Sequence, residues 1–153
     1  MPQVKTTFEV TQKDAKLKRL IASIETAKGE VVDVGLLEGT GAAGQIAQYG
    51  FFNEFGTKHI PSRSFMRSTF DQHRRKYEQI LKKGYDQALA GKIPLRRALY
   101  TVGVEAQGDI MLRITNLRSP RNAPSTIRKK GSSNPLIDDG HMRMAISFDV
   151  RSK

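Results

Sequence analysis

Three histidines and one acidic pair are the side chains of this chain that are best suited to bind a metal or to transfer protons. His59, His73 and His141 are scattered, and none belongs to an HExxH motif or a similar pair of ligands. Asp138 and Asp139 precede His141 and could form a metal or acid–base site. Asp-Asp-Gly is also common turn chemistry, because aspartate side chains accept hydrogen bonds from nearby backbone N–H groups. We favour the interpretation in which a carboxylate caps a short helix.

The remaining patterns also point away from catalysis. His73 falls on the apolar side of a predicted helix, where a core or boundary histidine is more common than a ligand. The glycine-rich segment 39–44 lacks the GxxxxGK(S/T) and GxGxxG phosphate-binding motifs, so we interpret it as a flexible turn. The chain has no cysteine and no GxSxG motif. The sequence therefore predicts no enzymatic activity, no cofactor and no metal site.

The charge of the chain is large and unevenly distributed. The 153 residues carry a net charge of +11. Residues 1–56 hold 6 basic and 7 acidic side chains, whereas residues 57–153 hold 20 basic and 8 acidic ones. This excess favours nucleic acid or an acidic protein surface as a neighbour, although a run of charge is more often a solvated face.

Length and hydropathy predict one domain without a membrane segment. A chain of 153 residues suits a single domain with one core. No apolar run approaches the roughly 20 residues needed to span a bilayer, and the first ten residues contain no apolar signal core. Together with the absence of cysteine, this predicts a protein that is made and assembled in a reducing cytoplasm.

Apolar periodicity predicts the elements that must position these residues. The expected strands lie at 6–10, 30–37 and 146–150. The expected helices lie at 14–27, 45–55, 65–89 and 94–117. The apolar stripes of the two long helices contain Met66, Phe70, Tyr77, Ile80, Leu81 and Ala88, and then Leu95, Leu99, Val102, Ala106, Ile110, Ile114 and Leu117. We predict an α+β domain in which a small, mostly antiparallel sheet packs against two long helices.

Residues 118–135 form the least globular stretch of the chain. They include three prolines and five basic residues but no acidic residue. So few apolar side chains cannot offset an ordering entropy of about 1–2 kcal/mol per residue. We therefore predict an extended and flexible basic arm. Its basic residues, which are candidates for contacts with partners, are Arg118, Arg121, Arg128, Lys129 and Lys130.

An aromatic cluster and one arginine precede the first long helix. Phe51, Phe52 and Phe55 supply more aromatic surface than one short helix normally buries, so part can pack on the sheet and part can anchor another subunit. Arg63 lies just before a helix start, where the helix dipole disfavours a cation. A carboxylate partner such as Glu54 would explain this position, and a solvent-exposed arginine is the alternative.

Two segments together resemble a known family. The first, YGFFNEFGTKHIPSRSFMR, covers residues 49–67, and the second, NPLIDDGHMRMAI, covers residues 134–146. Their order, about seventy residues apart with two amphipathic helices between them, resembles the small tail-component family of siphophages and Mu-like phages. This family includes proteins labelled virion morphogenesis, tail completion or neck proteins. The region of resemblance covers roughly 100 of the 153 residues.

The family pattern matches this sequence closely, with two departures. In the family, an aromatic-Asn-Glu-Phe-Gly-Thr run precedes Pro-x-Arg-x-Phe at the start of a long helix. A second motif, Asn-Pro-Leu-x-Asp-x-Gly-x-(Leu/Met)-x-x-(Ser/Ala)-Ile, lies near the C-terminus. Here Ser64 stands where a second proline is common, and Asp139 stands where threonine is common. Both residues suit a helix start or a turn, so the departures leave the expected fold unchanged.

The resemblance implies a structural virion protein. Such a protein forms a homo-oligomeric ring, expected to be sixfold, at the head–tail interface. It is expected to contact the tail terminator or tail tube and the head-completion proteins, and to sit in the neck of the virion after assembly in the host cytoplasm. Rings need self-contacts between different surfaces that close by rotation, and a basic arm reaching over a neighbour would supply one.

The charge suggests a second hypothesis, a basic DNA-binding protein without enzymatic activity. It would neutralise phosphates through the charged face of helix 65–89 and the arm 118–135, and its DNA affinity would depend steeply on salt. No helix-turn-helix, zinc-finger or ribonucleoprotein signature supports it. The two hypotheses overlap, because a neck ring surrounds the channel through which DNA leaves the head.

Overall fold

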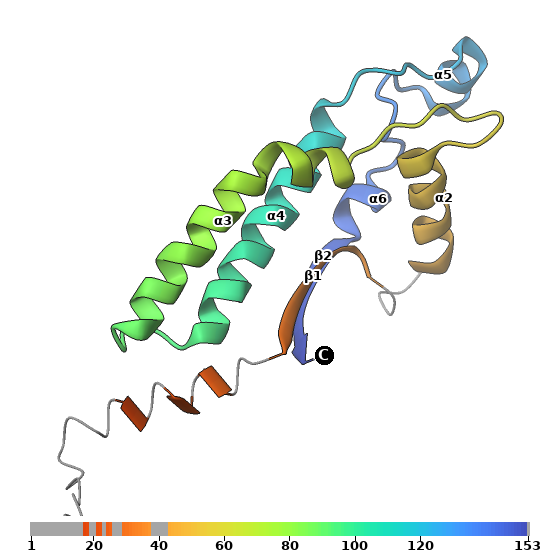
Figure 1. Cartoon of the computed structure of the whole chain (residues 1–153). Helices are drawn as coiled ribbons and strands as arrows, with labels where there is room; N and C mark the ends of the chain where they lie inside the picture. Colours follow the sequence, from red (N-terminus) through yellow and green to blue (C-terminus); the bar gives the residue numbers. More distant parts are fainter. Residues whose placement is uncertain (1–16, 19–20, 23, 26–28, 38–42, 153) are drawn as a thin grey trace, which may run out of the picture.

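The computed structural model describes residues 17–18, 21–22, 24–25, 29–37 and 43–152. Two long antiparallel helices, α3 (Arg67–Leu89) and α4 (Leu95–Asn116), lie side by side, and a two-stranded sheet lies against α4 (Figure 1). The predicted α+β class, with a small antiparallel sheet packed on two long helices, is confirmed.

The sheet pairs the first described strand with the last one. β1 (Glu30–Leu36) runs antiparallel to β2 (Ile146–Ser152), and Leu36 lies opposite Ile146. Side chains alternate between the two faces of a strand, and Ile146, Phe148 and Val150 share the face toward α4, where Phe148 contacts Gly103. Both strands agree with the predicted ones, and the alternation explains why Ile146, Phe148 and Val150 are separated by polar residues.

The core lies between the sheet and the helices. Its larger group of buried side chains consists of Phe65, Ile110, Ile114, Leu117, Leu136, Met142 and Ile146. A smaller group, formed by Tyr77, Val102 and Ala106, joins α3 to α4. The stripe predicted for α4 is therefore correct. The stripe predicted for α3 includes one error, because Phe70 is 56% exposed and the neighbouring Thr69 is buried in its place.

Three shorter helices gather at the end of the molecule where α3 begins (Figure 1). They are α2 (Ala43–Phe55), α5 (Pro124–Lys130) and α6 (His141–Met144). α2 contacts both β1 and α6, so it is anchored to the sheet as well as to the C-terminal part of the chain. The segments that resemble the tail-component family all lie at this end.

The predicted arm 118–135 is only partly extended, because α5 occupies its centre. Pro124 lies in the first turn of this helix, and Gly131 ends it in the left-handed conformation with φ 70°. Proline in a first turn and glycine after a last turn are start and stop signals of helices. The prediction of an extended arm relied on its charged, proline-rich composition and overlooked these local helix signals.

The expectations for the N-terminal part fall largely outside the described residues. The predicted strand 6–10 lies outside them, as do most residues of the predicted helix 14–27. Leu17, Ile21 and Ile24, which belong to the apolar positions of that helix, are helical and exposed. Most of the glycine-rich segment 39–44 also lies outside the described residues.

The contact between the two long helices leads to a first prediction. A Cβ atom at Gly84 would lie 2.4 Å from the Cβ of Ala98, so the helices must move apart to accept it. We expect Gly84→Ala to lower the free energy of unfolding by about 1–3 kcal/mol. The control is Gly108→Ala on α4, where nothing lies within 4 Å of the new Cβ. This control should raise the free energy of unfolding by about 0.5–1 kcal/mol, because alanine favours the helix. Urea denaturation followed by circular dichroism measures both, and equal effects would contradict the close helix contact.

Candidate functional site

The carboxylate of Glu54 connects α2 to the start of α3. Glu54 lies in the last turn of α2 and is only 1% exposed. Its Oε2 accepts hydrogen bonds from the backbone N–H groups of Phe65 at 2.7 Å and Met66 at 3.0 Å, and its Oε1 accepts one from Arg67 at 3.0 Å. The first N–H groups of a helix have no partners within the helix. A side chain from another helix therefore caps α3, whose own N-cap residue Met66 makes no side-chain cap.

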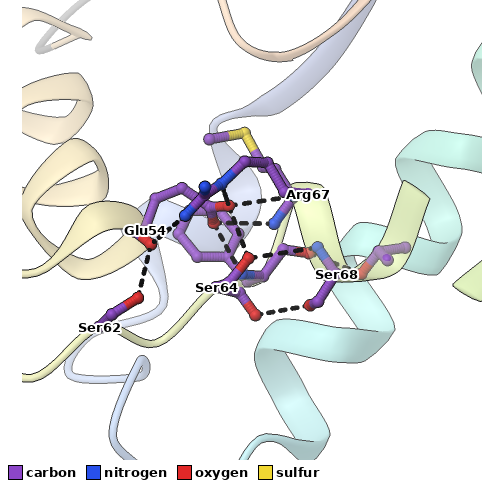
Figure 2. Close-up of polar contacts among 8 residues, drawn as sticks. Glu54, Ser62, Ser64, Arg67 and Ser68 are labelled. Atoms are coloured by element: carbon purple, nitrogen blue, oxygen red, sulfur yellow. Dashed lines mark hydrogen bonds and ion pairs between the residues drawn. The ribbon is translucent and has the colours of Figure 1, made fainter. Parts of the chain in front are cut away.

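Further donors complete the surroundings of this carboxylate. The hydroxyl of Ser64 and the Nε of Arg67 donate to Oε1 at 2.7 and 3.0 Å (Figure 2). Burial raises the pKa of the Glu54 carboxyl. The hydrogen bonds from the backbone of Met66, the Ser64 hydroxyl and the backbones of Phe65 and Arg67 outweigh it, so the pKa lies below its ordinary value. The carboxylate is therefore ionised at neutral pH and serves as a structural anion.

A short hydrogen-bonded loop leads from α2 to α3. Gly56 follows the helix with φ 80°, and a Cβ at this position would lie 2.9 Å from the backbone nitrogen of Ser62. The Oγ1 of Thr57 accepts hydrogen bonds from the backbone N–H groups of His59 at 3.2 Å and Ile60 at 3.0 Å. The run Asn-Glu-Phe-Gly-Thr thus has a physical basis, in which the acid caps, the glycine turns and the threonine fixes the loop.

Arg63 attaches the basic arm to the same loop. This residue is 5% exposed, and its Nε and Nη2 donate to the backbone carbonyls of Pro120 at 2.8 Å and Arg121 at 3.1 Å. Its Nη1 donates to the Oδ1 of Asn53 at 3.1 Å. The predicted pairing with Glu54 is wrong, because that carboxylate is occupied by the start of α3. The alternative of a solvent-exposed Arg63 is also wrong, because the arm covers the side chain.

Asn134, which belongs to the second family-like segment, fixes the C-terminal end of the arm. The Nδ2 of Asn134 donates to the backbone carbonyl of Thr115 at 2.9 Å, which ties the end of the arm to the end of α4. Its Oδ1 accepts hydrogen bonds from the backbone N–H groups of Leu136 at 3.0 Å and Ile137 at 3.2 Å. The Oδ1 of Asp139 accepts the backbone N–H of His141 at 3.0 Å. The predicted capping role is therefore confirmed for Asp139, whose Oδ2 also lies 2.7 Å from the Nδ1 of His141.

Two phenylalanines form an exposed pair on α2. The ring centroids of Phe51 and Phe55 lie 4.6 Å apart, and the residues are 56% and 50% exposed. The guanidinium carbon of Arg67 lies 4.4 Å from the centroid of the Phe55 ring, in cation–π geometry. Phe52 is half-buried. The predicted cluster is thus divided, and Phe55 does not belong to the core.

The basic side chains of the arm mostly reach solvent. Arg118, Arg121, Arg128 and Lys129 are exposed. Lys130 is half-buried, and its Nζ donates to the backbone carbonyl of Asn134 at 3.2 Å. Because α5 and α2 lie at the same end of the molecule (Figure 1), this end combines the basic arm with the aromatic pair. Sequence patterns could not have shown this proximity, because about seventy residues separate the two elements.

A polar cluster between α3 and α4 escaped the sequence-based analysis. The Nζ of Lys76 donates to both carboxylate oxygens of Asp109 at 3.0 and 2.9 Å, and the hydroxyl of Tyr77 donates to the same group at 3.0 Å. His73 lies beside it, half-buried, with its Nδ1 3.1 Å from the backbone carbonyl of Thr69. Burial raises the pKa of the Tyr77 hydroxyl, and the bond to Asp109 adds to the effect. This cluster holds the two helices together.

Within the part of the chain that the structure describes, no group of three or more His, Asp or Glu residues could hold a metal ion. None of its described helices is long and apolar enough to cross a membrane. No protein-family model, curated protein or solved structure matches the chain. Any functional assignment therefore depends on the site geometry together with the resemblance of the two sequence segments.

The buried carboxylate leads to a second prediction, on stability and pH. We expect Glu54→Gln to lower the free energy of unfolding at neutral pH by about 3–5 kcal/mol, because the buried network loses its negative charge and an NH2 donor replaces one of the two acceptor oxygens. The folded-state pKa of Glu54 lies below its unfolded value of about 4.3. Its stabilisation is therefore fully present above that value and is lost as the pH falls through the folded-state pKa.

Urea denaturation of both proteins from about pH 7 to about pH 3 tests this prediction. The wild type should lose stability at acidic pH, and the Glu54→Gln protein should lose less. Arg74→Ala is the control, since Arg74 pairs with Glu78 on the surface of α3, where the two side chains are 69% and 61% exposed, and the pair should contribute less than about 1 kcal/mol. Identical pH profiles of the wild type and the Glu54→Gln protein would contradict the role of this carboxylate.

Proposed function

We propose that the chain is a structural, non-enzymatic protein of a tailed-bacteriophage virion that forms a ring at the head–tail interface. The observation that supports this most is that both segments of the family resemblance take part in one contact network. Glu54 and Arg63 of the first segment hold α3 and the arm. Asn134 and Asp139 of the second segment hold the end of the arm and α6. The two segments that carry the resemblance are therefore brought together at one end of the molecule.

A ring requires two different surfaces on each copy, one that docks on the next copy and one that receives it. The exposed pair Phe51 and Phe55 is suited to the first role, because aromatic side chains are enriched among interface anchors. The arm with α5 is suited to contacts with a neighbour, because it projects basic side chains into solvent. In this proposal the ring partners are further copies of the chain, the tail terminator or tail tube, and the head-completion proteins.

The second candidate function is non-specific DNA binding. It is favoured by the 20 basic and 8 acidic side chains of residues 57–153 and by exposed cations along α3, including Arg74, Arg75, Lys82 and Lys83. Electron microscopy of the purified protein distinguishes the two candidates. Closed rings would support the connector, whereas a monomer with steeply salt-dependent DNA affinity would support the alternative.

The aromatic pair leads to a third prediction. We expect a Phe51→Ser/Phe55→Ser variant to remain folded, because both rings are at least half exposed, and to lose ring formation. Phe70→Ser is the matched control, since Phe70 is 56% exposed on α3, and it should still assemble. Phe65→Ala, by contrast, should cost about 3–5 kcal/mol of stability because its ring is fully buried. Mass photometry measures assembly and circular dichroism measures folding. Rings formed equally well by the double variant and the control would exclude the aromatic pair as an anchor.

The arm leads to a fourth prediction, on protease sensitivity. We expect trypsin to cut the free monomer after Arg128 or Lys129, which are exposed, and to cut more slowly after Arg121, whose carbonyl is held by Arg63. Assembly should protect all three sites if the arm reaches over a neighbour. Mass spectrometry of the fragments gives the order of cleavage. A free monomer that resists cleavage in α5, or a ring that is cut as fast as the monomer, would show that the arm is not an assembly element.

A further inference from the structure

A groove with a volume of about 530 Å³ lies between the loop after α2 and the arm. Its lining includes His59 and Arg63 from the loop, and Arg121, Thr126 and Lys130 from the arm. None of the described residues that line it is acidic. We call it the Arg63 groove, because Arg63 is almost completely buried, whereas Arg121 is exposed and Lys130 is half-buried.

The charge of Arg63 lacks a compensating anion among the described residues. Its three hydrogen bonds go to two backbone carbonyls and one amide oxygen, all of which are neutral. A guanidinium has five N–H donors, so one N–H on Nη1 and one on Nη2 remain without a described partner. Buried charges in proteins are normally paired with an opposite charge. Burial lowers the pKa of Arg63, and no carboxylate counteracts this effect.

We propose that the Arg63 groove binds a carboxylate side chain from an acidic segment of a neighbouring protein subunit. The planar guanidinium fork matches a carboxylate and can donate two hydrogen bonds to it. Arg121 and Lys130 add two positive charges to the same groove. The inference deepens the proposed function and rests on it, because the partner is another subunit of the assembly.

A phosphate of duplex DNA fits this groove less well. Phosphates line the outside of a stiff duplex, whose persistence length is about 50 nm. Such a rod does not enter a groove of about 530 Å³ to reach a guanidinium that is 5% exposed. A single extended peptide segment can enter it and insert one side chain. Exposed cations such as Arg128 and Lys129 are better placed for phosphate contacts.

The test measures binding of a fluorescein-labelled hexaglutamate peptide to the full-length protein by fluorescence anisotropy. The groove variant is Arg121→Ala/Lys130→Ala. Arg63 contacts only the backbone carbonyl of Arg121, so this replacement keeps that hydrogen bond. The matched control is Lys82→Ala/Lys83→Ala, which removes the same charge from exposed positions on α3, about 22 Å further along the helix than its first residue. We expect the groove variant to weaken binding at least tenfold and the control less than twofold.

Arg63→Lys tests the guanidinium itself, since it keeps the charge and loses the planar fork. It should weaken peptide binding at least tenfold while circular dichroism shows a folded protein. If this variant fails to fold, the groove variant still decides the question. Equal losses in the groove variant and the control would overturn the proposal, because binding would then follow net charge alone.

A DNA duplex and inorganic phosphate test whether the groove is a phosphate site. A short DNA duplex that displaces the peptide, with the same sensitivity to the groove variant, would overturn the proposal and identify a phosphate site. Binding of inorganic phosphate without binding of hexaglutamate would identify an adventitious ion only, and would overturn it as well. The proposed function is tested apart from the groove by electron microscopy without peptide. If the protein forms rings but does not bind hexaglutamate, only the proposal of a carboxylate site in the groove is overturned. If the protein binds hexaglutamate in the groove but never forms rings, the proposed connector function is overturned and the groove proposal is supported.

Discussion

A carboxylate that is almost completely buried must receive hydrogen bonds in place of its lost water, and this constraint on Glu54 fixes the end of the molecule where α3 begins. The donors come from the first backbone N–H groups of α3, from Ser64 and from Arg67. Those N–H groups in turn need an acceptor, because a helix start leaves them unpaired. The carboxylate and these N–H groups therefore complete each other's hydrogen bonding, and α2 cannot move relative to α3 without leaving buried polar groups unpaired. The exposed rings of Phe51 and Phe55 are held on this fixed helix.

Arg63 lies nine residues after Glu54 and is also buried, but its described hydrogen-bond partners carry no opposite charge. Glu54 has a cation and several amides around it, whereas the described hydrogen-bond partners of Arg63 are all neutral oxygens. The carbonyls of Pro120 and Arg121 are enough to place the arm, but they carry no full negative charge. Among the described residues at this end, Glu54 is the buried carboxylate, and it caps α3. The nearby arginine is left as an attachment point for the arm and as a positive charge that faces a groove.

The elements of this fold were predictable where burial follows local periodicity. The stripe of α4 was predicted correctly because this helix packs on both α3 and the sheet. Phe70 was wrongly assigned to the core, since apolar character alone cannot show that Thr69 is buried and Phe70 is exposed. The helix α5 was missed because five like charges and three prolines outweighed the signals of Pro124 and Gly131. The partners of Arg63 lie 57 and 58 residues away and are backbone carbonyls, which no side-chain pattern reveals.

The residues of the two family-like segments have internal tasks in this structure. Glu54 caps α3, Arg63 holds the arm, Asn134 ties the arm to α4, and Asp139 caps α6. A resemblance that consists of such residues concerns how the fold is built, and it says little about which surface meets a partner. Contacts with partners must be made by side chains that these internal bonds leave available. At the same end of the molecule these are the exposed rings of α2, the exposed cations of the arm and the guanidinium donors of the Arg63 groove. Variants in these side chains can therefore separate assembly from folding, whereas variants in the capping residues will lose both together.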